Sequence, residues 1–170
     1  INKINFKEGN ESEESESYVQ KVDTFTINGI RLEMIRIPGG SFKMGSNDGD
    51  ANEKPVQNRQ VSSFYLSKYE VTQKLWFVIM NTNPSTVIND NYPVNNVSWD
   101  DCQLFIQKLN ALTGRNFRLP TETEWEYASK AKLKPEGGIE TVGYKYSGTS
   151  TDLSDYAWYS VNSGGKIPAV

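Results

Sequence analysis

Apolar and polar positions in the first half of the chain follow a short-period pattern that predicts several short strands. The apolar segments of FTINGIRLEMIRI are separated by Asn28-Gly29, a dipeptide strongly favoured in two-residue hairpin turns. Pro38-Gly39-Gly40 marks a second turn, after which residues 41–44 predict another strand. The segment 61–71 is rich in β-branched and aromatic residues and predicts a strand that leads into a helix.

Three later segments have the spacing of amphipathic helices, and each begins with a capping residue. Thr72 precedes the first helix and Ser98 the second, while Thr121 and Glu124 form the capping box of the third. Gly114 ends the second helix as a C-cap. The stripe expected to face the core in the second helix consists of Cys102, Phe105, Ile106, Leu109 and Leu112.

The third predicted helix carries glutamates at alternate positions, Glu122, Glu124 and Glu126, which raises the question of acid–base chemistry. Alternate residues of a helix point about 200° apart, so capping is the simpler role for Glu124. Arg118 lies just before this helix and is expected to form a part-buried ion pair that fixes the fold. The core is expected to contain Trp76, Trp99 and Trp125.

Charge changes this picture only at the start of the chain. The 18 basic and 21 acidic residues give a net charge of -3, so no nucleic-acid partner is expected. The acidic, serine-rich run EGNESEESE predicts a linker at residues 1–23, followed by one domain at 24–170. The chain begins at Ile1 without an apolar run near the ~18 residues of a membrane span. We therefore interpret it as a mature or trimmed product and expect no membrane insertion.

Cysteine and histidine content excludes several enzyme classes. Histidine is absent and Cys102 is the only cysteine, so sites of the Ser-His-Asp, Cys-His and zinc-thiolate kinds lack parts. Cys102 is interpreted as a small buried residue, and the neighbouring Asp100 and Asp101 would raise the pKa of its thiol. Carboxylate chemistry, binding of a hard cation, or no chemistry at all remain.

The order of motifs resembles that of the sulfatase-modifying, formylglycine-generating-enzyme family. The motifs are IPGGSFKMG at 37–45, EKPV at 53–56, YEVTQKLW at 69–76, YPVNNVSWDDC at 92–102, TGRNFRLPTETEWEYA at 113–128 and AWYSVNSGG at 157–165. The resemblance implies an α+β fold, a formylglycine-generating-enzyme-like variant of the C-type lectin fold. It has short strands, about three helices and long loops.

The enzymes of this family oxidise a cysteine of a sulfatase peptide to formylglycine, using molecular oxygen, copper and a cysteine pair near the domain's C-terminus. The expected continuation, a segment resembling GLYDMSGNVWEW, has no counterpart before Val170, which implies a domain truncated at its C-terminus. No catalytic residue is carried over to this chain. Copper is expected only if the complete protein carries the cysteine pair.

The family's calcium sites use asparagine, aspartate and backbone oxygens in the second half of the domain. Asp152, Asp155 and Asn162 supply suitable hard ligands and are our candidate calcium site. Tyr156 stands where an asparagine ligand would be expected, which weighs against this hypothesis.

Three functional hypotheses remain. The first is a non-catalytic binding module in the cell envelope, whose glycine-punctuated aromatic segment 143–165 presents a surface to a protein or glycan ligand. The second is a truncated formylglycine-generating oxidase, and the third is a structural or assembly component. Strand edges left open by a truncated domain would favour self-association.

Overall fold

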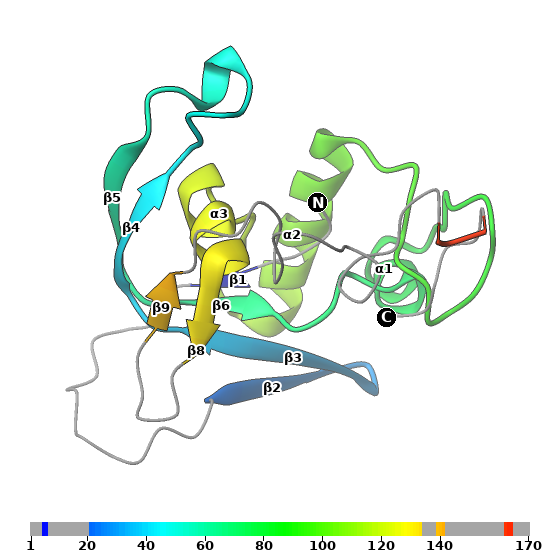
Figure 1. Ribbon diagram of the computed structural model, residues 1–170. Helices are drawn as coiled ribbons and strands as arrows, with labels where there is room; N and C mark the ends of the chain where they lie inside the picture. Colours follow the sequence, from blue (N-terminus) through cyan, green and yellow to red (C-terminus); the bar gives the residue numbers. More distant parts are fainter. Residues whose placement is uncertain (1–4, 7–20, 134–138, 142–161, 165–170) are drawn as a thin grey trace.

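The computed structural model describes residues 5–6, 21–133, 139–141 and 162–164, and Figure 1 shows its short strands and three α-helices. The helices are α1 (Gln73–Met80), α2 (Trp99–Thr113) and α3 (Glu122–Lys130), with a 3-10 turn at Ala51–Glu53. The strands are β1 (Asn5–Phe6), β2 (Val22–Ile27), β3 (Ile30–Ile37), β4 (Gly40–Met44), β5 (Gln57–Val61), β6 (Phe64–Ser67), β7 (Phe117–Arg118), β8 (Ala131–Leu133) and β9 (Ile139–Thr141). The expected α+β class is confirmed. Within the described ranges, every helix is too short or too polar to cross a membrane.

The main sheet is antiparallel and has the strand order β2-β3-β6-β1-β7. The predicted hairpin joins β2 to β3, with Asn28 at φ 47° and Gly29 at φ 82°, the left-handed backbone that this two-residue turn requires. Two further antiparallel pairs, β4 with β5 and β8 with β9, form separate small sheets.

Two strands occur where the sequence pattern predicted none. We expected a linker at residues 1–23, yet Asn5–Phe6 forms β1 between β6 and β7, and β2 already begins at Val22. β5 lies in the polar sequence QNRQV, four of whose five side chains are exposed. Strand pairing uses backbone groups that every residue but proline supplies in full, so a polar strand leaves no apolar signature. The acidic run itself lies outside the described residues.

The central strand β6 is buried on both faces. All four of its residues are buried, and alternate side chains of a strand point to opposite sides. Tyr65 belongs to a core with α1 and α2, whereas Phe64 and Leu66 belong to a second core with β4, β5 and α3. The side chains of β6 therefore contribute to both hydrophobic cores, one on each face of the strand.

The first core contains aromatic pairs between elements, but it does not include every residue that helical spacing assigned to it. Trp76 of α1 stacks on Phe105 of α2 with ring centroids 5.0 Å apart. The centre of the α2 stripe is buried as expected, whereas Leu112 is 54% exposed and Cys102 is half-buried. Trp99 and Trp125 are 68% and 45% exposed, so their assignment to the core was wrong. Trp99 opens α2 and Leu112 lies in its last turn, beyond the stretch that packs on the sheet.

The second core explains the Pro-Gly-Gly motif. The rings of Phe42 and Tyr127 lie 5.2 Å apart, and the Tyr127 hydroxyl donates a buried hydrogen bond of 3.0 Å to the Pro38 carbonyl. A Cβ atom on Gly40 would lie 2.6 Å from the Tyr127 hydroxyl oxygen. Glycine is therefore required there for α3 to approach the β4–β5 hairpin.

The loop between α1 and α2 is held by one buried amide, that of Gln73, which is 1% exposed. Its Nε2 donates to the carbonyls of Val87 at 2.9 Å and Pro93 at 3.4 Å. Its Oε1 accepts from Asn83 Nδ2 at 2.9 Å and from the Asn89 backbone N–H at 3.1 Å. The loop thus satisfies every hydrogen-bonding group of this buried amide, and the amide in turn holds four points of the loop together.

Replacing Gln73 by Met should lower the free energy of unfolding by about 2 kcal/mol, because four part-buried hydrogen bonds to the loop are lost while side-chain volume is nearly kept. Urea unfolding of the whole chain measures this. The matched control Gln107→Met, at an exposed position of α2, should change stability by no more than about 0.5 kcal/mol. Equal stability of the two variants would contradict the role given to Gln73.

Candidate functional site

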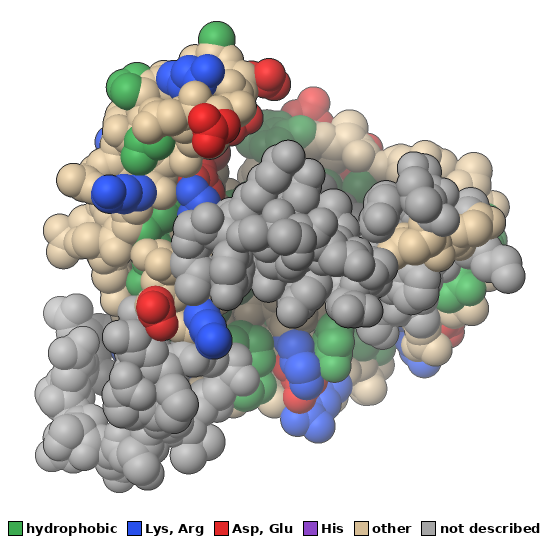
Figure 2. Space-filling view, in the orientation of Figure 1, with side chains coloured by type: hydrophobic (Ala, Val, Ile, Leu, Met, Phe, Trp, Pro, Cys, Tyr) green, Lys and Arg blue, Asp and Glu red, His purple; other side chains and the backbone are tan. Residues whose placement is uncertain are grey.

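A polar cavity of about 360 Å³ lies between β5, the turn that follows it, and the start of α3. Figure 2 shows Lys and Arg side chains on the lobe that β4 and β5 form. The cavity is lined by Arg59, Gln60, Val61, Ser62, Ser63, Arg118, Thr121, Thr123 and Glu124.

One wall of the cavity is fixed by an ion pair between Arg118 and Glu124. The guanidinium donates two hydrogen bonds to the carboxylate, Nη1 to Oε2 at 2.7 Å and Nη2 to Oε1 at 2.6 Å. Arg118 Nη1 also donates to the Leu119 carbonyl at 3.0 Å. This pair confirms the ion pair predicted for Arg118.

Glu124 serves the helix and the ion pair at once. Its Oε2 accepts the Thr121 backbone N–H at 2.8 Å, while the Thr121 hydroxyl accepts the Glu124 N–H at 3.2 Å. The predicted capping box is therefore present. Burial alone would raise the pKa of Glu124, but the hydrogen bonds from Arg118 and Thr121 outweigh it and lower the pKa to about 2.

The opposite wall carries a guanidinium with a different environment. Arg59 is exposed and forms no ion pair within the part of the chain that the structure describes. Since Arg118 is already neutralised by Glu124, the charged groups of the lining leave one uncompensated positive charge, that of Arg59. No feature of the sequence alone marked Arg59, because its place depends on the pairing of β5 with β4.

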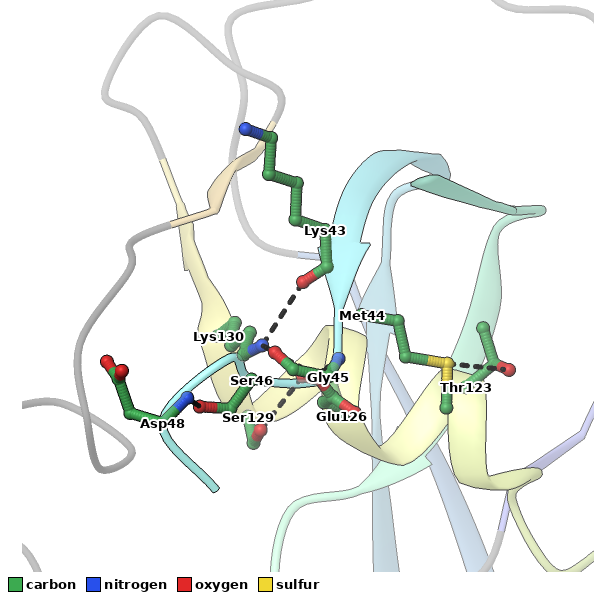
Figure 3. A network of polar contacts seen from close by, with 9 residues as sticks. All are labelled: Lys43, Met44, Gly45, Ser46, Asp48, Thr123, Glu126, Ser129 and Lys130. Atoms are coloured by element: carbon green, nitrogen blue, oxygen red, sulfur yellow. Dashed lines mark hydrogen bonds and ion pairs between the residues drawn. The ribbon is translucent and has the colours of Figure 1, made fainter. Parts of the chain in front are cut away.

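A second polar network, seen close by in Figure 3, attaches the end of β4 to α3. Glu126 Oε1 accepts the Gly45 backbone N–H at 2.7 Å and a hydrogen bond from Lys130 Nζ at 2.6 Å. Lys130 Nζ also donates to the carbonyls of Lys43 and Gly45 at 3.1 and 3.3 Å. Glu126 therefore holds a turn, a role that its spacing on the helix did not predict.

Cys102 lies on α2 and is not among the residues that line the cavity. Burial raises the pKa of its thiol, and the carboxylate of Asp101 raises it further. A reactive cysteine needs a lowered pKa, so Cys102 does not have the environment of a nucleophile. A copper site built on a cysteine pair does not fit these 170 residues, which contain one cysteine.

The candidate calcium site is not tested by the structure. Asp152 and Asp155 lie outside the described residues, and Asn162 lies in a turn at 162–164. Across the described ranges, no three His, Cys, Asp or Glu side chains gather closely enough to hold a metal ion. Calcium binding at these positions stays a prediction, and the aromatic segment 143–165 is described only at its 162–164 turn.

Replacing Glu124 by Gln should lower the free energy of unfolding at neutral pH by about 2 kcal/mol, because charge-assisted hydrogen bonds are lost. The pKa of Glu124 is lower in the folded state, so its stabilisation is complete above its ordinary pKa of 4.5. That stabilisation is lost as the pH falls toward about 2. Denaturant unfolding at neutral pH and at acid pH should show the two proteins converging.

The control is Glu122→Gln, an exposed glutamate in the same helical turn, which should cost no more than about 0.5 kcal/mol. A Glu124→Gln variant as stable as this control, or a stability difference from the parent that persists at acid pH, would contradict the argument.

Comparison with known proteins assigns this fold and its motifs to a family. The family model of the sulfatase-modifying factor enzyme 1-like domain matches residues 20–168. Chaperone protein LppX of Paenibacillus barcinonensis is 31% identical over 170 residues, which cover 79% of this chain and 55% of that protein. Inactive C-alpha-formylglycine-generating enzyme 2 of Bos taurus is 26% identical over 180 residues, with 74% and 57% covered. The chain thus spans little more than half the length of these two relatives.

A solved structure, that of Treponema denticola variable protein 1, has the same arrangement. It is 27% identical with a TM-score of 0.71, and the match covers 85% of this chain and 66% of that one. The expected fold, a formylglycine-generating-enzyme-like variant of the C-type lectin fold, is thereby confirmed. Because the family model extends over residues 20–168, the chain belongs to the sulfatase-modifying, formylglycine-generating-enzyme-like domain family.

Proposed function

We propose that this domain is a non-catalytic binding module that holds a protein ligand in the cell envelope. The observation that carries the proposal is the polar cavity of about 360 Å³, beside which the guanidinium of Arg59 has no ion pair among the described residues. Strand β5, the turn that follows it and the start of α3 form this cavity.

The names of two relatives support this reading. The bovine relative is named an inactive formylglycine-generating enzyme, which fits use of the scaffold without its chemistry. The Paenibacillus relative is named a chaperone, which favours a protein over a glycan as the ligand.

Site-specific photocrosslinking on the full-length protein, in the cells that make it, tests the binding role. A benzoylphenylalanine in place of Ser62, an exposed residue of the cavity, should give an adduct with one envelope protein, identified by mass spectrometry. The same group at Leu112, which is exposed on α2 and does not line the cavity, should give none. Adducts of equal yield at both positions, or at neither, would reject the role of this face. An adduct between two copies of the chain would instead support self-association.

The family match keeps one alternative, a formylglycine-generating oxidase whose cysteine pair lies elsewhere in the full-length protein. The full-length protein is incubated with copper, oxygen and a peptide carrying a sulfatase motif, and the mass of the peptide is measured. We expect no change, as for the relative that is named an inactive formylglycine-generating enzyme. Conversion of the cysteine to formylglycine would overturn the non-catalytic proposal, and a Cys102→Ser variant would show whether this thiol takes part.

A further inference from the structure

We propose that the cavity beside Arg59 is a carboxylate-binding subsite, which receives an acidic side chain of an extended segment of the protein ligand. The proposal rests on the proposed function, because it names the chemistry by which the same face recognises its ligand. It goes beyond the family assignment, since the family motifs at 53–56 and 113–128 leave Arg59 outside.

The two guanidinium groups of the cavity have different tasks. Arg118 is occupied by two hydrogen bonds to Glu124 and one to the Leu119 carbonyl, so it shapes the wall. Arg59 has no ion pair among the described residues and projects its charge beside the cavity. A concave surface with one uncompensated positive charge concentrates its field on an anion. A guanidinium also matches a carboxylate through two parallel hydrogen bonds.

The strand register explains how Arg59 reaches the cavity. In the β4–β5 pair Arg59 lies opposite Phe42, and Val61 lies opposite Gly40. Residues directly opposite on neighbouring strands share a face of the sheet. Phe42 and Val61 are buried against α3, so Arg59 continues the face that packs on this helix. On β5, Arg59 is the charged residue of the face that contacts α3, and it lies at the border between the packed residues and the cavity.

Size and surroundings favour a peptide carboxylate. About 360 Å³ is near the lower end of ligand pockets, roughly 300 to 1,000 Å³, which suits one side chain with its adjoining backbone better than an oligosaccharide. Ser62 and Ser63 line the same space, and a serine hydroxyl can donate a hydrogen bond to a carboxylate. Within the described strands, β5 pairs on one side only, with β4, and an edge strand can align an extended peptide.

The test uses the full-length protein and a library of octapeptides with random flanking residues and either Glu, Asp, Gln or Asn at the central position. The protein should enrich peptides with a central carboxylate over those with the isosteric amide. Arg59→Gln should reduce this enrichment about tenfold, because the charged hydrogen bonds are lost. Arg59→Lys should retain part of it, since the charge remains without the planar fork.

Lys108→Gln is the matched control, because it removes one positive charge from an exposed position of α2 that does not line the cavity. It should leave the enrichment unchanged, and all variants should unfold at the same urea concentration. Equal enrichment of amide and carboxylate peptides, or carboxylate binding that survives Arg59→Gln, would overturn the proposal. Binding of trigalacturonate in an Arg59-dependent manner, with no peptide enriched, would overturn the peptide assignment in favour of an acidic glycan.

The outcome is separable from that of the proposed function. A Ser62 adduct without carboxylate enrichment would leave the binding face intact and remove only this subsite. Carboxylate enrichment without a Ser62 adduct would retain the subsite and reject the envelope protein as its partner.

Discussion

The double burial of β6 is the constraint on which the rest of the structure depends. Tyr65 points into the core with α1 and α2, and Phe64 and Leu66 point into the core with α3, so neither face of the strand is free for solvent. Antiparallel sheets commonly leave one face wet, and such strands alternate apolar and polar residues. Here the run FYLS cannot alternate. A shift or a change in the twist of β6 therefore alters the packing of both cores, so we expect the two cores to unfold as one cooperative unit.

Around this double core, the irregular segments are positioned by polar side chains that come from helices. Gln73 of α1 holds the loop before α2, Glu126 of α3 holds the turn after β4, and Glu124 of α3 holds the end of β7 through Arg118. Each of these groups is at least partly buried and has several partners, which makes a hydrogen bond to it harder to replace by water. These hydrogen bonds also determine the shape of the cavity, because its walls are β5 and the start of α3, which the contacts of Glu124 and Glu126 hold in place.

Local chemistry made part of this structure predictable. The turn at Asn28-Gly29, the caps at Thr72 and Ser98, and the pair of Arg118 with Glu124 depend on residues close in sequence. Helical spacing says which residues share a face, but not which end of the helix extends beyond the sheet, and so it misplaced Trp99. The cavity joins β5 to the start of α3, and the role of Arg59 in it follows only from the register with Phe42. No pattern within a short window carries that information.

The loop between α1 and α2 has a consequence for protein engineering. Gln73 fastens it through the backbone of Val87, Asn89 and Pro93, so its path is set by main-chain groups that most residues possess. Ile88, between two of these anchors, has a side chain that is 67% exposed. Side chains at such a position can be exchanged while the main-chain path is kept. This loop is therefore a natural graft site, where a foreign epitope or reporter peptide would be displayed on a frame fixed from beneath.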